Sequence, residues 1–311
     1  MLHLVSPVFI PVNRRCSSLR VLAIAVAALT LAFGHAHTAS AADSQIAVVA
    51  AENFYGDIAS QIGGDRINVV SIMSNPDQDP HLFETTPGIV RQLTNAQIVI
   101  LNGANYDPWM DKLLAAAPRP ERTVINAAQL TGRKAGDNPH LWYDPATMPA
   151  VATALADAFT RADHAHAPDY AARLKATLAS LERIAQRVAQ LKAKHSGTVV
   201  TATEPVFGLM TDAVGLSMRN QRFQLAMMND TEPSARDVAA FENDLRERKV
   251  RVLIYNSQVS EKLTKRLRDI AVKAKVSVVG VTETMPANTN FQDWVLGELD
   301  VLDKALIRPN S

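Results

Sequence analysis

The sequence predicts an α/β protein with two lobes, each a mostly parallel sheet flanked by helices, joined by one long rigid helix. Short apolar runs alternate with helix-like patterns in two separate stretches of the chain. Apolar strands that alternate with helices are typical of parallel sheets covered on both faces. A long helical pattern separates the two stretches. The order of the elements therefore places one α/β unit on each side of a helical connector.

The first 42 residues are predicted to be a secretory signal and not part of the fold. Arginines precede the apolar run Val21–Gly34, and small residues follow it. This run of about 14 residues is short of the roughly 20 that cross a bilayer. We expect cleavage after Ala41 or Ala42 and a periplasmic mature protein. The pair Arg14-Arg15 suggests a twin-arginine signal, but the residues after it are not apolar, which favours general secretion.

The N-terminal lobe is expected over residues 43–167 and the C-terminal lobe over residues 196–311. Strands are predicted where apolar and β-branched residues cluster, at Ile46–Ala50, Ile67–Ile72, Ile98–Leu101 and Thr123–Asn126 and then at Thr198–Ala202, Val250–Tyr255 and Val276–Val281. Helical spacing is found at 54–62, 87–94 and 108–117 in the first lobe and at 205–215, 234–248, 258–274 and 290–307 in the second. Both lobes thus have the alternation of a parallel sheet.

The connector is a helical pattern over residues 168–195. Its apolar residues recur at spacings of three and four, which places them on one helix face. Pro168 suits a helix start, and Gly197 follows the end as a stop signal. A helix of this length spans about 42 Å at 1.5 Å per residue. Such a helix can run along both lobes, and its rigidity restricts how far they swing.

Cysteine usage and charge exclude several classes of protein and site. The only cysteine, Cys16, precedes the apolar run, whereas a lipoprotein needs its cysteine directly after that run, so no lipid anchor is expected. Without Cys16 the mature chain has no disulfide and no thiolate ligand. The signal holds three arginines and no acid, which leaves 29 basic side chains beside all 31 acidic ones. This balance gives no reason to expect binding to nucleic acid or to an anionic membrane.

Two histidines share a local setting that suits a binding site. His81 and His140 each follow a predicted strand and loop of the first lobe, and each is preceded by a proline that fixes the local backbone. Ligands of open α/β sheets bind beyond the carboxyl ends of the strands. A lone histidine is more often structural than a ligand, but two in such positions favour a site. The other three mature histidines lie in polar segments that do not suggest a binding site. They are His164, His166 and His195.

Two carboxylates occupy comparable positions in the second lobe. Glu204 directly follows the strand predicted over 198–202, and Glu283 follows the strand predicted over 276–281. Singly, each has an ordinary explanation, because Glu204 suits a helix N-terminus and Glu283 suits an exposed loop. Together they are positioned to face the two histidines across a cleft.

Several motifs in order along the chain resemble those of one family. The segment 79–87 is similar to the signature D-P-H-x-Y-E-P-T-P, and 138–142 is similar to D/N-P-H-x-W. Residues 102–109 resemble an N-G…W segment, 204–208 an H-x-x-F-x-Y element, and 231–234 an E-P-S element. Along essentially the whole mature chain the sequence resembles the periplasmic metal-binding receptors of ABC importers, the cluster A-I or ZnuA/TroA-like family of zinc, manganese and iron solute-binding proteins.

The resemblance implies four metal ligands, two from each lobe. His81 and His140 match the two histidines of the first lobe. Glu204 matches a position that is histidine in many zinc receptors and glutamate in many manganese or iron receptors. Glu283 matches a position that is usually aspartate, and it reaches one methylene further. The loop 132–137 lacks the histidines found in many zinc receptors.

This sulfur-free ligand set accepts Mn²⁺, Fe²⁺ and Zn²⁺ as cargo. Bidentate glutamates would raise the coordination number above four and favour manganese or iron. Monodentate glutamates would leave a tetrahedral site that suits zinc. The sequence leaves this choice open.

The function implied is that of a monomeric receptor, not an enzyme, which captures a divalent metal between its lobes and delivers it to a membrane ABC permease. Metal affinity is expected to fall as the imidazoles protonate. Two alternatives remain at this point. A secreted metal-dependent hydrolase would need an open coordination position and a nearby base, and the chain has no H-E-x-x-H motif. An adhesin-like receptor homologue is suggested by the family association alone.

Overall fold

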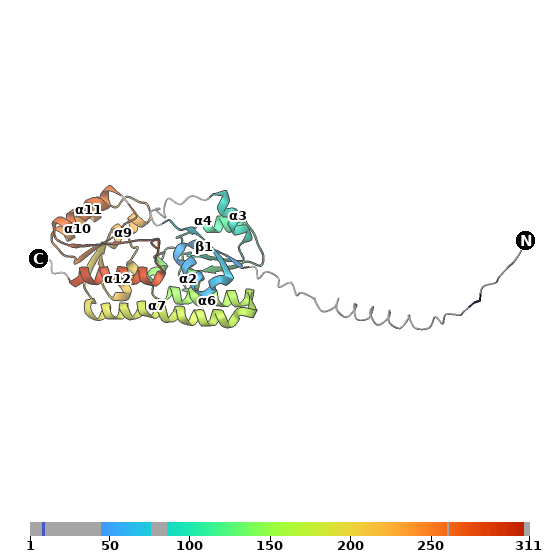
Figure 1. Ribbon diagram of the computed structural model, residues 1–311. Helices are drawn as coiled ribbons and strands as arrows, with labels where there is room; N and C mark the ends of the chain where they lie inside the picture. The colour runs from blue at the N-terminus through green and yellow to red at the C-terminus, as the bar shows by residue number, and fades with distance from the viewer. Residues whose placement is uncertain (1–7, 10–44, 76–85, 260, 308–311) are drawn as a thin grey trace, which may run out of the picture. The chain divides into compact units, whose positions relative to one another are not determined.

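A computed structural model describes residues 8–9, 45–75, 86–259 and 261–307. The predicted signal, residues 1–42, lies outside the described residues except for 8–9. From Gln45 onward the chain forms one compact unit with two parallel sheets, each flanked by helices, which confirms the predicted fold class (Figure 1). Among the helices of the described residues, none is long and apolar enough to cross a membrane.

The first sheet has the strand order β2-β1-β3-β4, and its order reverses between β1 and β3. Side chains alternate between its faces, so that Val48 packs toward α2 and α6 while Val49 packs toward α3 and α4. The strands and helices of this lobe are β1 (Ile46–Glu52), α2 (Asn53–Gly63), η1 (Gly64–Arg66), β2 (Ile67–Met73), α3 (Pro87–Asn95), β3 (Ile98–Leu101), α4 (Trp109–Ala116), β4 (Thr123–Asn126), α5 (Ala127–Leu130), η3 (Leu141–Tyr143), α6 (Thr147–Ala162) and η4 (His164–His166).

The second sheet repeats this arrangement with the order β6-β5-β7-β8, which reverses between β5 and β7. Ile254 packs on the side of α8 and α12, and Leu253 packs on the side of α9, α10 and α11. Its elements are β5 (Val199–Ala202), α8 (Gly208–Val214), β6 (Ser217–Arg219), α9 (Gln221–Met228), α10 (Ala235–Arg246), β7 (Val252–Asn256), α11 (Lys262–Lys273), β8 (Ser277–Val281) and α12 (Phe291–Ile307). The elements α6, α9 and β6 were not predicted from the sequence.

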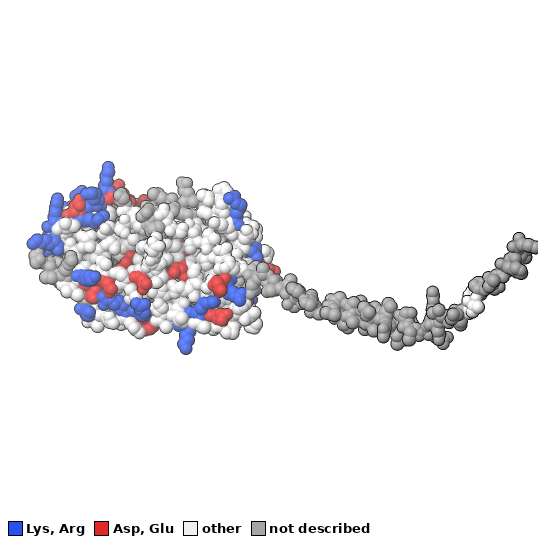
Figure 2. Space-filling view, viewed as in Figure 1, with Lys and Arg blue, Asp and Glu red and all other residues white. Residues whose placement is uncertain are grey.

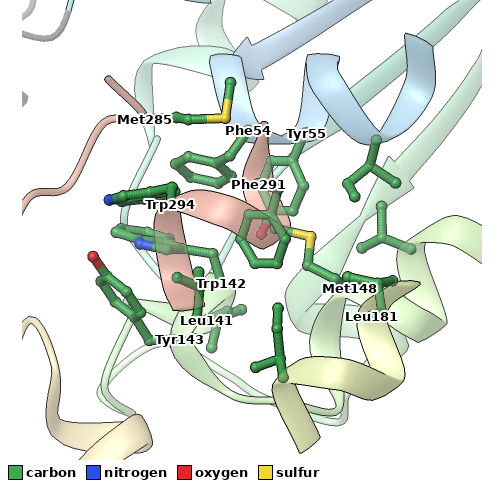
Figure 3. Packing of buried hydrophobic residues seen from close by; sticks show 14 of the residues in the cluster. Phe54, Tyr55, Leu141, Trp142, Tyr143, Met148, Leu181, Met285, Phe291 and Trp294 are labelled. Carbon is green, nitrogen blue, oxygen red and sulfur yellow. The ribbon is translucent and has the colours of Figure 1, made fainter. Parts of the chain in front are cut away.

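The long helix α7 (Ala167–His195) confirms the predicted connector and begins one residue earlier than expected. It packs against α2 and α6 of the first lobe and against α8 and α12 of the second (Figure 1). One hydrophobic cluster includes residues of α7 and of both lobes. Figure 3 shows part of this cluster, where the ring of Phe54 of α2 lies near both Trp142 and Trp294 of α12, with ring centroids 4.7 and 6.0 Å away. The two lobes therefore share one continuous core.

Side chains of α2 bind the backbone of the C-terminal lobe between Met285 and Phe291. The amide of Asn53 donates to the carbonyl of Met285 at 2.7 Å and accepts from its N–H at 3.0 Å. Asp57 accepts from the N–H of Phe291 at 2.9 Å. One turn later Gln61 exchanges two hydrogen bonds with Gln292 of α12. We call this row of contacts the interlobe seam.

A partly buried glutamate lies close to the seam. Glu298 of α12 accepts from the N–H of Thr282 and from the indole of Trp294, both at 3.1 Å. The hydroxyl of Tyr143 lies 2.6 Å from Glu298 and also 2.6 Å from the carbonyl of Thr282. That hydroxyl has one proton, which the carbonyl oxygen requires, so Glu298 must supply the proton of the other hydrogen bond. Burial accordingly raises the pKa of Glu298 to about 8.

The change Glu298→Gln tests this protonated state. An acid whose folded-state pKa is raised from 4.5 to about 8 contributes stability below the lower value, and this contribution is lost as the pH rises through the higher one. The glutamine amide supplies the same donor at every pH. We therefore expect urea unfolding to show a stability advantage of the variant that grows from about pH 5 to about pH 8. A difference that stays constant over this range would contradict a protonated Glu298.

Charged side chains join α7 to α12, where Figure 2 shows acidic and basic residues side by side. Asp303 accepts from Arg187 at 2.8 Å and from His195 at 2.7 Å. Burial by itself would raise the pKa of Asp303, but the hydrogen bonds from His195 and Arg187 outweigh it and lower the pKa below 3.8. The ionised aspartate therefore stabilises the fold.

We expect Asp303→Asn to lower the free energy of unfolding by about 1.5–3 kcal/mol at neutral pH, because it replaces hydrogen bonds to a charged group. A lowered folded-state pKa means that this contribution is present above the ordinary value of 3.8 and is lost as the pH falls through the folded value. The free energies of unfolding of the two proteins, measured by chemical denaturation at a series of pH values, should therefore converge under acid conditions. Equal stabilities at neutral pH would show that the cluster contributes nothing.

Candidate metal centre

Polar residues gather where the strand order of each sheet reverses. Glu52 ends β1 and Asn102 follows β3 in the first lobe, while Glu204 follows β5 and Asn256 ends β7 in the second. All four are buried. Such switch points are where open α/β sheets bind ligands. The two lobes meet beside these points, because Tyr106 in the loop after β3 donates to Glu283 in the loop after β8 at 3.0 Å.

The ring of His140 is held in one orientation by Asn138. His140 is 2% exposed and precedes the short helix η3. The amide of Asn138 donates from Nδ2 to the carbonyl of Pro205 at 2.8 Å, so its Oδ1 faces His140 and accepts from Nδ1 at 2.7 Å. The proton of the neutral ring is thereby assigned to Nδ1, and Nε2 retains its lone pair. A Cβ at Gly208 would lie 2.8 Å from Nδ2, so this approach requires glycine.

The lone pair of His140 faces a carboxylate. Nε2 lies 3.5 Å from Oε2 of Glu283, which is 0% exposed. With the ring proton on Nδ1, both of these atoms are acceptors, and a cation between them would bind both. Metal bonds of about 2.1 Å to each atom would subtend about 115°, near the tetrahedral angle of about 109°. The pair is therefore spaced as two ligands of one transition-metal ion.

Glu204, the second predicted carboxylate, is linked to Glu283 by Asn256. The Nδ2 atom of Asn256 lies 2.6 Å from Oε1 of Glu283 and 3.3 Å from Oε2 of Glu204, whose side chain is buried. Of the predicted ligands, His140 and Glu283 therefore lie close together, and Asn256 links Glu204 to Glu283. Within the described ranges no three His, Cys, Asp or Glu side chains converge closely enough to hold an ion by themselves. The fourth predicted ligand, His81, lies outside the described residues.

The loop after β3, which is held by hydrogen bonds to Asp107, places Tyr106 beside Glu283. The carboxylate of Asp107 accepts from the N–H groups of Asn102 and Gly103 at 2.7 and 2.8 Å, and burial raises the pKa of Asp107 to about 6. The intervening residues Gly103, Ala104 and Asn105 all have positive φ angles. Burial, together with the charges of Glu283 and Glu52, raises the pKa of Tyr106, which keeps its hydroxyl a donor.

Aromatic rings and a hollow border the site on different sides. The ring centroid of Trp142 lies 4.8 Å from that of Tyr106 and 5.4 Å from that of His140. A hollow of about 410 Å³ lies beside His140 and Tyr106, and both lobes contribute to its lining, with Met73 and Trp109 on one side and Met228 and Asp230 on the other. The site is thus bordered by the apolar ring of Trp142 and by a hollow through which a small ion can approach His140.

Sequence reasoning missed the residues that hold the predicted ligands. Asn256 ends a buried strand just as Glu204 follows one, so the same signal could have identified it. Asn138 is part of the motif that contains His140, but its hydrogen bonds to both lobes depend on the tertiary structure. Two other histidines of the described ranges lie away from the centre, since His166 binds Asp163 and His195 binds Asp303.

Comparison with known proteins gives a consistent result. Manganese-binding lipoprotein MntA of Bacillus subtilis is 26% identical over 231 residues, which are 71% of this chain and 74% of that protein. Zinc-binding protein TroA of Treponema pallidum is 24% identical over 252 residues, 78% of this chain and 80% of that protein. The solved structure of periplasmic zinc binding protein TroA from Treponema pallidum has a TM-score of 0.72 at 21% identity, covering 85% of this chain and 100% of that one.

The family model described as "ZnuA: Zinc-uptake complex component A periplasmic" matches residues 48–305. This match spans both lobes and the helix between them, and it includes the residues that form the candidate centre. The chain therefore belongs to the ZnuA family.

Proposed function

We propose that this protein is the substrate-binding component of a metal ABC importer, which captures one divalent transition-metal ion between its lobes and delivers it to the membrane permease. The observation that carries the proposal is the 3.5 Å separation of Nε2 of His140 and Oε2 of Glu283 at the junction of the two sheets. Membership of the ZnuA family supports it. We assign residues 43–167 and 196–311 to the two lobes and 168–195 to their connector.

The proposed ligands are His81, His140, Glu204 and Glu283. The geometry described above supports three of them. For His81 the support is its place in the segment 79–87, since the residue lies outside the described part of the chain. The unliganded set combines neutral imidazoles with two carboxylates, and such a set attracts a divalent cation without a thiolate.

The cargo is proposed to be Mn²⁺, Zn²⁺ or Fe²⁺. Relatives of the chain are named for each of these metals, as a manganese-binding lipoprotein in Bacillus subtilis, a zinc-binding protein in Treponema pallidum and an iron ABC transporter substrate-binding lipoprotein in Streptococcus pyogenes. These names describe binding and transport components, so neither the metal-dependent hydrolase nor the adhesin-like alternative is favoured.

Delivery is proposed to involve small movements near the site. The interlobe seam and α7 both join the lobes, so wide separation would break the hydrogen bonds of Asn53, Asp57 and Gln61 and expose the shared core. We further propose a monomer in the periplasm with its signal removed and without a lipid anchor, because Cys16 precedes the apolar run. No nucleic-acid partner is proposed.

Metal analysis of the purified mature protein tests the proposal. After chelation and exposure to Mn²⁺, Fe²⁺ and Zn²⁺ in competition, we expect wild type to retain one equivalent of metal. His140→Ala and Glu204→Ala each remove a ligand and should weaken binding by about 100-fold or more. His81→Ala tests the ligand outside the described residues in the same way.

His164→Ala is the matched control, because this exposed histidine lies away from the centre and its loss should leave the stoichiometry and affinity unchanged. If wild type retains no stoichiometric metal under any condition, the proposed function is wrong. If the His140 and Glu204 variants bind as wild type does, the metal lies elsewhere on the molecule.

A further inference from the structure

Asn256 occupies a central position among the proposed ligands. It is the last residue of β7, beside the point where the order of the second sheet reverses, and it is 1% exposed. Its Nδ2 atom contacts one oxygen of each proposed carboxylate ligand, Oε1 of Glu283 at 2.6 Å and Oε2 of Glu204 at 3.3 Å. No role for this residue was evident from the sequence motifs.

The hydrogen bonds around Asn256 fix which end of its amide faces the carboxylates. Oδ1 accepts from the backbone N–H of Gln258 at 3.0 Å, so the NH₂ group must point the other way. An amide NH₂ has two hydrogens, which is one for each carboxylate. The side chain of Gln258 in turn accepts from the N–H groups of Glu283 and Thr284 at 2.5 and 3.1 Å. The amide and the Glu283 backbone are thus held by the same turn.

We propose that Asn256 is a specificity-determining positioning residue, which restricts Glu204 and Glu283 to one metal-binding oxygen each. This inference rests on the proposed function. In Glu283 the two oxygens have different surroundings, since Oε1 accepts from Asn256 at 2.6 Å, while Oε2 accepts from Tyr106 at 3.0 Å and lies 3.5 Å from Nε2 of His140. The shorter hydrogen bond from a buried amide makes Oε1 the weaker metal ligand of the two oxygens. The Asn256 amide also donates to Oε2 of Glu204, at the longer distance of 3.3 Å.

The consequence is a low coordination number. Two imidazole nitrogens and two single carboxylate oxygens make four ligands, the number and geometry that zinc prefers. Release of the second oxygens would allow five or six ligands, which suits manganese and iron better. Because the amide is neutral, it separates the two carboxylates without cancelling the negative charge that attracts the cation. A lysine at this position would cancel half of that charge.

Two substitutions remove the amide donor in different ways. Asn256→Leu has similar size and no charge. Asn256→Ala removes the amide altogether and adds no charge or possible ligand. We expect both variants to shift the ratio of zinc to manganese bound in competition toward manganese by about tenfold, as outer contacts of a metal site commonly do.

Cobalt substitution reports the coordination number directly. Wild type loaded with Co²⁺ should show the intense visible absorption of a four-coordinate ion, and both variants should show the weaker absorption of higher coordination. Neither the metal ratio nor this spectrum would change if Asn256 only stabilised the fold. If the leucine variant fails to fold, the alanine variant decides by the same two measurements.

Asn220→Ala is the matched control. Asn220 lies in the same lobe, and its amide donates to Thr201 and to the carboxylate of Asp244, both at 3.1 Å, away from the metal centre. We expect this variant to be less stable but unchanged in metal preference. Folded Asn256 variants with the wild-type metal ratio, or a wild-type cobalt spectrum of six-coordinate type, would overturn the inference. Wild type that binds no metal would instead contradict the proposed function.

Discussion

The arrangement of the molecule depends on hydrogen bonds that buried backbone groups make across the two lobes. The segment after β8 is not part of a regular element, and buried N–H and C=O groups there need partners. The first lobe supplies them, because Asn53 binds both backbone groups of Met285 and Tyr143 binds the carbonyl of Thr282. Glu283 lies between these anchored residues. The position of its backbone is therefore set by these anchors, and hydrogen bonds from Asn256 and Tyr106 position its carboxylate.

Around this junction the structure tolerates several acidic groups that would repel one another if all were charged. Glu298 keeps its proton, with a pKa of about 8, and burial also raises the pKa of Glu52 well above its usual range. Glu204 and Glu283, which both contact Asn256, are the acidic side chains proposed to bind the cation. Neutral donors such as Asn256 and Tyr106 keep these two carboxylates in place. The surroundings thus favour a bound ion without supplying a competing positive charge.

The sequence was informative where a pattern repeats over many residues. Both sheets, most helices and α7 followed from apolar spacing, and Glu204 and Glu283 followed from their places after buried strands. The strand β6 has three residues and one inward apolar side chain, too short to show a period. Helix α6 has apolar residues at helical spacing, namely Val151, Leu155 and Phe159, so this helix could have been predicted from the sequence. Hydrogen bonds such as those of Asn256 could not be predicted, because they join residues far apart in the chain.

The continuous core has a consequence for how the protein folds. Two lobes that shared only a flexible linker could each unfold alone, but here Trp142, α7 and Trp294 belong to one cluster that neither lobe completes by itself. Loss of either half would leave apolar surface of the other exposed to water, so the whole is expected to behave as one cooperative unit. Binding free energy of an ion at the junction would then add to the stability of every part of the chain, including helices far from the ion.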